Sequence, residues 1–236
     1  MKKMDQKIAL IMNRNSYAGR EFLSHLKGMD IDVISIGSYG SIEEAEEERC
    51  GGFWKPLKEE DLRNHFAFFN FKSLASKNLQ DFLSKKRYQL GVQGGTGILK
   101  NNIIEKFSTG IINFHPGDLP AYRGCSAPEW QLYEGKDIVC TAHFIDNDID
   151  AGDIICKRKL NVNLNSYEKF RASVYPEIAV FVRELIWDLQ KSDDLIRGAW
   201  TQNEGEAKYR KYMEREHLEE LKNFFQALNN SKVSLR

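Results

Sequence analysis

The chain has 236 residues, of which 42% are hydrophobic, and it carries 34 Lys and Arg against 34 Asp and Glu. This length suits one large domain, or one domain with an extension. The formal net charge of +0 argues against a polyanion such as nucleic acid as the main partner. No apolar run approaches the ~18 residues of a membrane span, and the N-terminus lacks a signal-peptide pattern. The sequence therefore predicts a cytoplasmic protein with no membrane partner.

Four cysteines are scattered along the chain, at Cys50, Cys125, Cys140 and Cys156. They form no CxxC pair and no tight cluster with histidines, so we expect no metal site. Four cysteines in a chain of this length are typical of reduced thiols in the cytoplasm.

The first half of the chain alternates strand-like and helix-like segments. Apolar runs predict strands at residues 7–12, 31–36, 88–93 and 110–114, and amphipathic patterns predict helices at 16–27 and 73–87. The acidic run at 43–48 is typical of a solvated helical face. This alternation predicts an α/β fold, with a Rossmann-like, mostly parallel sheet and helices on both faces. His115 would follow the strand at 110–114, at the carboxyl edge where such sheets bind ligands.

The second half changes character. Residues 138–145 and 153–162 are β-rich and are joined by a loop at 146–152, which predicts a hairpin or adjacent strands. A long helix is expected at 166–190, and Pro176 should kink or divide it. Another amphipathic helix is expected at 207–228. We therefore divide the chain into a catalytic domain at 1–190 and a helical C-terminal extension at 191–236.

Two glycine- and aspartate-rich patterns invite wrong assignments. A dinucleotide-binding loop through Gly95 and Gly97 would need a third glycine at position 100, which is occupied by Lys100. A phosphate-binding loop would need a following Gly-Lys-Ser/Thr, which is absent. The better prediction is a glycine turn with positive φ. The aspartates from Asp146 onward resemble a calcium loop, but its sixth and twelfth positions hold Ala151 and Lys157. Among the histidines, His25, His65 and His217 are expected to be surface or structural, and His143 is left open.

Three separated residues carry the chemistry: Asn113, His115 and Asp150. An amine that attacks a carbonyl needs a donor for the developing oxyanion and a group that takes up its proton. An amide, an imidazole and a carboxylate supply both without a serine or cysteine nucleophile. Taken without context, the same residues are also compatible with a plain strand end and a turn.

The surrounding motifs are more specific. The runs NFHP at 113–116, LPAYRG at 119–124, HF at 143–144 and DAGDII at 150–155 resemble the signature of formyltransferases that use N10-formyltetrahydrofolate. The resemblance covers roughly residues 7–162 and implies the formyltransferase fold. It implies that Asn113, His115 and Asp150 form the catalytic triad. Asn113 and His115 would polarise the formyl group, and Asp150 would set the protonation of His115 and take up the amine proton.

The resemblance also implies where the co-substrate N10-formyltetrahydrofolate binds, with no metal. The pterin is expected between the loop after the fourth strand and the acidic loop, through Gln93, Gly94, Gly95, Thr96, Gly97, Ile98, Leu99, Asp146, Asn147, Asp148 and Ile149. Glycines would let backbone groups approach a flat heterocycle closely.

Other segments bear on the acceptor. Glycinamide ribonucleotide transformylases carry a glycine-rich turn after the first strand that binds phosphate, whereas this chain has NRNSYAG at 13–19. Methionyl-tRNA formyltransferases have a β-rich C-terminal domain, whereas the roughly seventy residues after Val162 have a helical pattern. The net charge of +0 also fits poorly with a phosphate-rich partner.

The YRG motif with Pro128 and Trp130 resembles the sugar N-formyltransferases, although Pro128 stands four residues after Gly124 rather than three. The predicted reaction formylates the amine of a nucleotide-linked dideoxy sugar, such as a dTDP- or GDP-4-amino-4,6-dideoxyhexose, for O-antigen and lipopolysaccharide biosynthesis. A glycinamide ribonucleotide transformylase, a formate-releasing hydrolase and a non-catalytic folate-binding module remain open alternatives. A homodimer is the default expectation. The nominated acceptor contacts are Tyr122, Arg123, Trp130, Trp200 and Tyr209.

Overall fold

The computed structural model describes residues 7–14, 16–37 and 47–233 of the chain, with side chains up to residue 228. Most of the acidic run at 43–48 lies outside the described residues. Of that run, Glu47 and Glu48 are described, and both are helical and at least partly exposed.

The centre of the molecule is a seven-stranded sheet in the order β3-β2-β1-β4-β5-β7-β8. Its strands are β1 (Ile8–Asn13), β2 (Ile31–Ile36), β3 (Ala67–Phe71), β4 (Leu90–Gln93), β5 (Gly110–His115), β7 (Val139–Phe144) and β8 (Ile154–Lys159). The first five strands in that order run parallel, and β7 and β8 are antiparallel to their neighbours. The predicted mostly parallel sheet and the adjacent strands β7 and β8 are confirmed, whereas edge strand β3, whose AFFNF lacks strict alternation, was not predicted.

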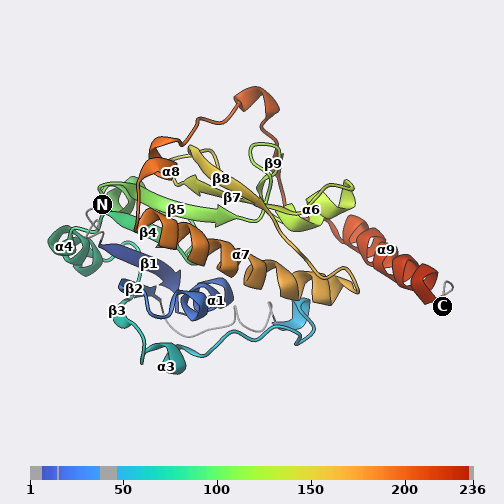
Figure 1. Cartoon of the computed structure of the whole chain (residues 1–236), viewed down its shortest axis with the longest axis horizontal. Helices are drawn as coiled ribbons and strands as arrows, with labels where there is room; N and C mark the ends of the chain where they lie inside the picture. The colour runs from blue at the N-terminus through green and yellow to red at the C-terminus, as the bar shows by residue number, and fades with distance from the viewer. Residues whose placement is uncertain (1–6, 15, 38–46, 234–236) are drawn as a thin grey trace.

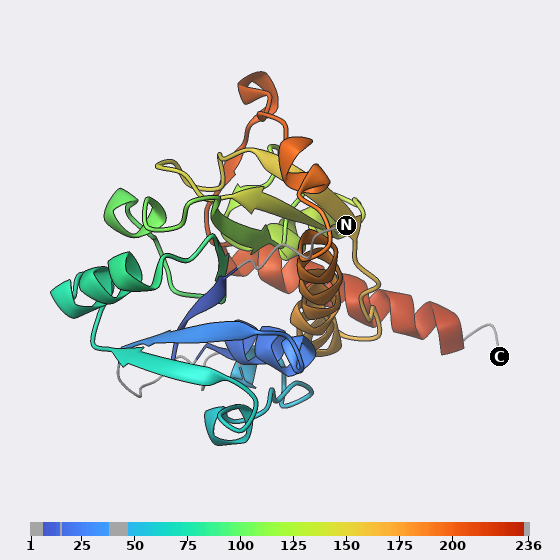
Figure 2. The same cartoon turned by 60° about the vertical axis from the view of Figure 1, so that its left-hand side comes forward.

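Helices cover both faces of this sheet (Figures 1 and 2). The helices of the described chain are α1 (Tyr17–Leu26), α3 (Glu59–Leu62), α4 (Lys77–Lys86), α5 (Asn101–Ile104), α6 (Ala127–Tyr133), α7 (Tyr167–Leu189), α8 (Asp194–Arg197), η1 (Glu204–Glu206) and α9 (Arg215–Val233). Because side chains alternate along a strand, Leu10 of β1 packs in the apolar core with α1 and α7, and Ile11 packs in the core with α4 and α5.

Helix α7 is the longest helix and the main cover of the sheet. The apolar residues along one side of this helix are all buried: Tyr167, Phe170, Val174, Ile178, Phe181, Leu185 and Leu189. Of the two effects expected of Pro176, division of the helix is wrong, because α7 runs without a break through it. A kink at Pro176 stays a prediction. Proline removes one backbone hydrogen bond, but Val174 and Ile178 on either side are fully buried and keep both halves on the core.

The last part of the chain differs from its prediction. The helix expected from residue 207 begins at Arg215, and the residues before it are extended. Tyr209–Arg210 forms β9, which pairs in parallel with β6 (Arg123–Gly124), and Trp200 forms a bridge with Ile154. These backbone hydrogen bonds to distant segments outweigh the local helical pattern. Residues 199–213 are called the strap, because they cross from β8 to β6 before α9 leaves the body (Figure 1).

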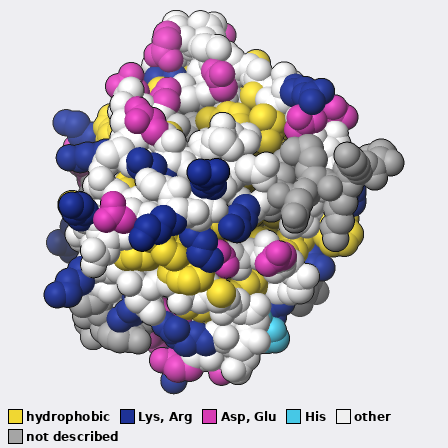
Figure 3. Space-filling view, turned by 90° about the vertical axis from the view of Figure 1, so that its left-hand side faces the viewer, with side chains coloured by type: hydrophobic (Ala, Val, Ile, Leu, Met, Phe, Trp, Pro, Cys, Tyr) yellow, Lys and Arg dark blue, Asp and Glu magenta, His cyan; other side chains and the backbone are white. Residues whose placement is uncertain are grey.

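No helix in the described part of the chain is long and apolar enough to cross a membrane. The balanced charge is unevenly spread over the surface. Seen from the side of α4, Lys and Arg side chains gather across the middle of the molecule with apolar side chains between them, and acidic side chains gather at the top (Figure 3).

Candidate active site

A cavity of about 580 Å³ lies at the carboxyl ends of β4 and β5. Its walls come from the β4–α5 loop, the β7–β8 loop, helix α1 and the strap. Asn113, His115, His143 and Asp150 all line it. The sequence prediction that these strand ends carry the site is consistent with this placement.

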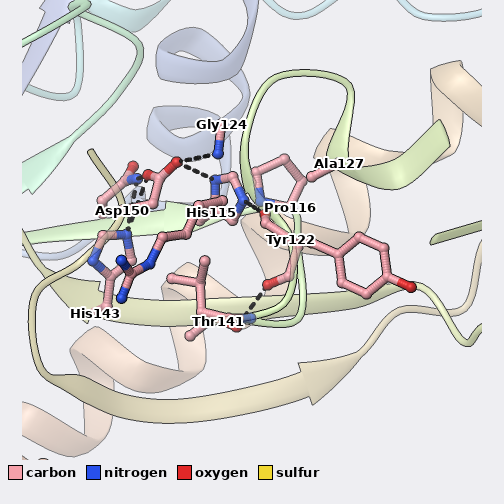
Figure 4. A network of polar contacts seen from close by, with 12 residues as sticks. His115, Pro116, Tyr122, Gly124, Ala127, Thr141, His143 and Asp150 are labelled. Atoms are coloured by element: carbon pink, nitrogen blue, oxygen red, sulfur yellow. Dashed lines mark hydrogen bonds and ion pairs between the residues drawn. The ribbon is translucent and has the colours of Figure 1, made fainter. Parts of the chain in front are cut away.

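Asn113 and His115 come from β5, and their spacing of two residues puts both side chains on one face of the strand. The neighbouring strand β7 is antiparallel, with His143 directly opposite Asn113 and Thr141 opposite His115. Directly opposite residues on such strands have their side chains within contact distance. The register thus brings a second imidazole into the site (Figure 4).

Asp150 reaches the same point from the β7–β8 loop (Figure 4). Its backbone is in the left-handed region, with φ at 54°. Its Oδ2 accepts a 2.9 Å hydrogen bond from the Gly124 backbone N–H and lies 3.4 Å from His115 Nδ1. Its Oδ1 lies 3.4 Å from Asn113 Nδ2 and 3.7 Å from His143 Nε2. The Asp150 carboxylate is therefore the centre on which the other three side chains converge.

The hydrogen bonds of His115 define the state of its ring. Nε2 lies 2.6 Å from the Tyr122 carbonyl oxygen, and since a carbonyl only accepts, Nε2 carries a proton. Nδ1 is left facing Asp150. Burial lowers the pKa of His115 below its ordinary value of 6.5, the Asp150 carboxylate opposes that fall, and His143 adds to it. A largely neutral ring thus presents its Nδ1 lone pair towards the site at neutral pH.

Asp150 is ionised in this setting. Burial alone would raise the pKa of its carboxyl, but the His115 and His143 rings and the Gly124 N–H lower it to about 2. A carboxylate that stays charged beside an imidazole that is uncharged at neutral pH is suited to proton transfer, because it stabilises the imidazolium that forms when the ring accepts a proton.

His143 is the residue that sequence reasoning left open. It is 1% exposed, and its Nδ1 lies 2.8 Å from the Phe144 carbonyl oxygen, so Nδ1 donates. Its Nε2 then accepts from Asn113 Nδ2 at 3.2 Å, which orients the amide. The available signal was strand alternation, because Thr141 and His143 share a face, but their pairing with β5 depends on a register that sequence does not reveal.

The two predicted pterin loops face each other across the cavity. Of the first, Gln93, Gly95, Gly97, Ile98 and Leu99 line it. Gly95 and Gly97 have φ of 79°, as the predicted turn requires. Gly94 and Thr96 lie behind: a Cβ on Gly94 would meet Leu10 at 2.9 Å, and Thr96 is 7% exposed.

All four residues of the acidic loop line the cavity as well: Asp146, Asn147, Asp148 and Ile149. Ile98 and Ile149 remain 71% and 45% exposed. A pair of loops with apolar tips and open backbone is a suitable cradle for a flat heterocycle with polar edges.

The predicted acceptor contacts are only partly brought together. Tyr209 lines the cavity, joined by Tyr212, which was not predicted. The Tyr122 hydroxyl instead donates to Glu134, and the Trp130 ring nitrogen donates to the Lys211 carbonyl. Neither side chain lines the cavity, and Trp200 lies outside it too.

Arg123 also differs from its prediction. It is 8% exposed, and its guanidinium donates to Gln202 and Glu204 rather than facing the cavity. Because a buried guanidinium needs partners for its N–H groups, the chain supplies them itself, and Arg123 is not available to a phosphate.

The start of α1 adjoins the cavity through a smaller hollow of about 250 Å³. The Ser16 hydroxyl accepts from the Gly19 N–H at 3.0 Å and caps the helix. The hollow is walled by aromatic rings, since Trp54 stacks on Tyr175 at 5.4 Å and meets the edge of Tyr17 at 5.3 Å. In the part of the chain that the structure describes, no group of three or more His, Cys, Asp or Glu could hold a metal ion.

Comparisons with known proteins also indicate a formyltransferase. The human trifunctional purine biosynthetic protein adenosine-3 is 36% identical over 66 residues, which are 28% of this chain and 6% of that protein. The match thus spans only a small part of the relative's length.

Solved structures with the same fold cover more of the chain. Phosphoribosylglycinamide formyltransferase from Streptococcus pneumoniae TIGR4 superposes with a TM-score of 0.57 at 17% identity, over 78% of this chain and 98% of that one. The N-formyltransferase from Helicobacter canadensis, solved with folinic acid and dTDP-3-aminofucose, gives 0.56 at 18% identity, over 90% and 72%. At these identities the likeness establishes the fold.

The family model described as formyl transferase matches residues 54–173, which is more than half of the chain and includes Asn113, His115, His143 and Asp150. The predicted formyltransferase resemblance is confirmed at this level, and the chain belongs to the formyl transferase family.

Proposed function

We propose that this chain transfers a formyl group from N10-formyltetrahydrofolate to the amine of a nucleotide-linked dideoxy amino sugar, in the cytoplasm, for O-antigen and lipopolysaccharide biosynthesis. One observation carries the transfer: Asn113, His115 and Asp150 converge at one point of a cavity of about 580 Å³. Amine attack on a formyl carbon needs these three kinds of group together.

In the transfer, the amine nitrogen bonds to the formyl carbon, the bond from that carbon to N10 breaks, and N10 takes the proton that the amine gives up. Asn113 Nδ2 donates to the formyl oxygen as negative charge develops on it. The 3.4 Å contact from this nitrogen to Asp150 is long for a hydrogen bond, so Asn113 can exchange it for a stronger acceptor at little cost.

His115 and Asp150 handle the proton. The resemblance implies that Asp150 takes up the amine proton, but a carboxylate whose pKa is lowered to about 2 is the weaker base. We therefore assign that proton to the lone pair on His115 Nδ1, 3.4 Å from Asp150 Oδ2, and the carboxylate stabilises the imidazolium that results. The charged ring then polarises the formyl oxygen and returns the proton to the leaving nitrogen. Nε2 stays bonded to the Tyr122 carbonyl throughout and keeps the ring in one orientation.

The co-substrate fits between the two loops at 93–99 and 146–149. N10-formyltetrahydrofolate supplies the formyl group. The exposed Ile98 and Ile149 side chains would cover the two faces of its flat ring, while backbone groups freed by Gly95 and Gly97 would meet its polar edge.

Two features favour a nucleotide sugar over glycinamide ribonucleotide as the acceptor. The N-terminus of α1, where a ribonucleotide phosphate would be expected, is capped by Ser16 and walled by Tyr17 and Trp54. The exposed rings of Tyr209 and Tyr212 stand at the rim of the cavity, where a base or sugar can stack.

A purine transformylase is the second candidate, because the superposition on the Streptococcus pneumoniae enzyme covers 98% of that chain. A mass-detected assay separates the two. The chain would be incubated with N10-formyltetrahydrofolate and a panel of 4-amino-4,6-dideoxy sugars on dTDP and GDP, with glycinamide ribonucleotide in parallel. A gain of one formyl mass on a sugar nucleotide supports the proposal, product from glycinamide ribonucleotide alone overturns it, and formate release without product indicates a hydrolase.

A further inference from the structure

Gln202 lies on the strap, far along the chain from the candidate triad, yet it is 5% exposed and borders the Asp150 loop. The strap is held there by backbone pairing, because the Ile154 N–H donates to the Trp200 carbonyl at 2.8 Å and the Trp200 N–H donates back at 3.0 Å. Two residues further on, the Gln202 side chain enters the space between that loop and β6.

All four hydrogen-bonding positions of this side chain are used. Its Nε2 donates to the carbonyl oxygens of Asp150 at 2.9 Å and Gly152 at 2.8 Å. Its Oε1 accepts from Arg123 Nε at 3.1 Å and Nη2 at 2.9 Å. An amide has two N–H donors and two lone pairs, so Gln202 is fully satisfied by these three residues.

The β7–β8 loop, to which Gln202 donates these hydrogen bonds, turns sharply at residues 150–152. Asp150 is a non-glycine residue at positive φ, and a Cβ on Gly152 would lie 2.0 Å from the Phe144 carbonyl oxygen. Backbone in such a conformation persists when the surroundings hold it. The Gln202 amide bridges the carbonyls on both sides of Ala151 and so holds the turn from which the Asp150 carboxylate projects.

The Gln202 side chain also holds the segment that contains Gly124, whose backbone N–H bonds to the Asp150 carboxylate. Arg123, which Gln202 anchors, immediately precedes Gly124, and the Gly124 N–H donates to Asp150 Oδ2. The Glu204 carboxylate holds the other side of the Arg123 guanidinium. The contacts therefore form a closed ring from Gln202 through the Asp150 backbone, its carboxylate and Gly124 back to Arg123.

We infer that Gln202 is a positioning residue of the active site, which sets the distance from the Asp150 carboxylate to the His115 ring by holding the Asp150 turn and the Arg123–Gly124 strand together. This inference rests on the proposed formyl transfer for its effect on rate. Glutamine is the side chain that this position requires, because glutamate could pair with Arg123 but has no N–H for the two carbonyls. Methionine would fill the space without making any of the four bonds.

The test compares Gln202→Met with the matched control Asn203→Ala on the full chain. Asn203 is the next residue of the strap and is exposed, and within the described residues its side chain bonds to Gly205 and Glu206 of its own turn. Gln202→Glu is the second variant should the methionine protein fold poorly. The readouts are kcat and KM for both substrates, and the pKa of His115 from NMR titration of the histidine ring, assigned by difference with His115→Asn.

We expect Gln202→Met to lower kcat about ten- to a hundredfold, since a shift of about 1 Å at a reacting group costs this much, with KM changed less. The pKa of His115 should fall, because the Asp150 carboxylate that raises it moves away while burial and His143, which lower it, stay. Asn203→Ala should leave both unchanged. An unchanged His115 pKa in folded Gln202→Met, or a loss of thermal stability with unchanged kcat, overturns the inference.

The two proposals fail separately. If the unaltered chain formylates no acceptor, the proposed function is wrong, and the His115 titration still decides whether Gln202 positions Asp150, because it needs no turnover.

Discussion

The two halves of the sheet are built for different roles. Along the parallel strands β1, β2 and β4, all of which the structure describes, Ser35 is the one buried polar side chain. In β5 and the antiparallel strand β7, by contrast, His115, Thr141 and His143 are all buried. The parallel half is an apolar scaffold, and titratable groups concentrate where the strand direction reverses.

The reversal itself explains the concentration. In the parallel half, each strand contributes its carboxyl end and the following loop, so it offers mainly backbone groups such as those of Gly95 and Gly97. In the antiparallel pair, side chains stand directly opposite each other, as Asn113 does with His143. Two polar side chains from different strands can thus satisfy each other in a buried place, which a site with a charged centre requires.

If the antiparallel half carries the chemistry, His115→Ala should have the largest effect on rate. We expect turnover to fall at least about 10³-fold, because the His115 ring accepts the amine proton and returns it to the leaving nitrogen, with Asp150 stabilising the charged ring. Folate binding, measured by fluorescence titration, should be retained, since the pterin loops are separate elements. Turnover close to that of the unaltered protein would mean that the site does not act through His115, and would favour a binding module.

In the parallel half, Leu10→Ala should produce the opposite pattern. Leu10 is 0% exposed in the core between the sheet, α1 and α7, so its truncation should lower the free energy of unfolding by about 2–5 kcal/mol. Denaturant titration measures this loss. The kcat per folded molecule should not change, and a fall in kcat as large as that of His115→Ala would show that the two halves are not separable.

His143→Phe tests the cross-strand pair. Its Nε2 no longer accepts from Asn113 Nδ2, so the amide loses its orientation, and kcat should fall about ten- to a hundredfold. The pKa of His115 should rise, because His143 lowers it. In the unaltered protein, kcat should increase with pH, with a midpoint below 6.5, and then level off. In this variant the midpoint of that increase should move to higher pH.

Asp150→Asn is the matched counterpart for pH. The carboxylate raises the pKa of His115, so its removal should lower that pKa. The rise of kcat with pH should then have its midpoint at lower pH. Profiles from about pH 4.5 to 9 distinguish the two directions. A midpoint that moves the same way in both variants would contradict the assignment of the titrating group to His115.

The smallest effect is expected at the rim. Tyr209 is 55% exposed, and Tyr209→Ala should raise KM for the acceptor a few fold, about 1 kcal/mol, with kcat unchanged. Steady-state kinetics with the sugar nucleotide that the transfer assay identifies measure this change. Tyr133→Ala is the control, since that ring is also exposed but bonds to Glu220 on α9, outside the residues that line the cavity.

Local sequence patterns were enough to predict four of the five parallel strands, and the resemblance of the surrounding motifs to the formyltransferase signature implied the candidate triad. Short apolar runs predicted β1, β2, β4 and β5 to within two residues, because burial of a strand on both faces has a local signature. The long helix expected at 166–190 was also found, as α7. Pro176 does not divide it, because buried residues on both sides hold the helix on the core.

The remaining features required the assembled tertiary structure. The β5–β7 register that places His143 opposite Asn113, the burial of Arg123 and the path of the strap all depend on residues between 30 and 81 positions apart in the chain. Contacts at such separations leave no periodic pattern, since each partner looks locally like an ordinary strand, turn or helix residue. Gln202 was invisible for the same reason: its hydrogen bonds exist only once β6, β8 and the strap have met.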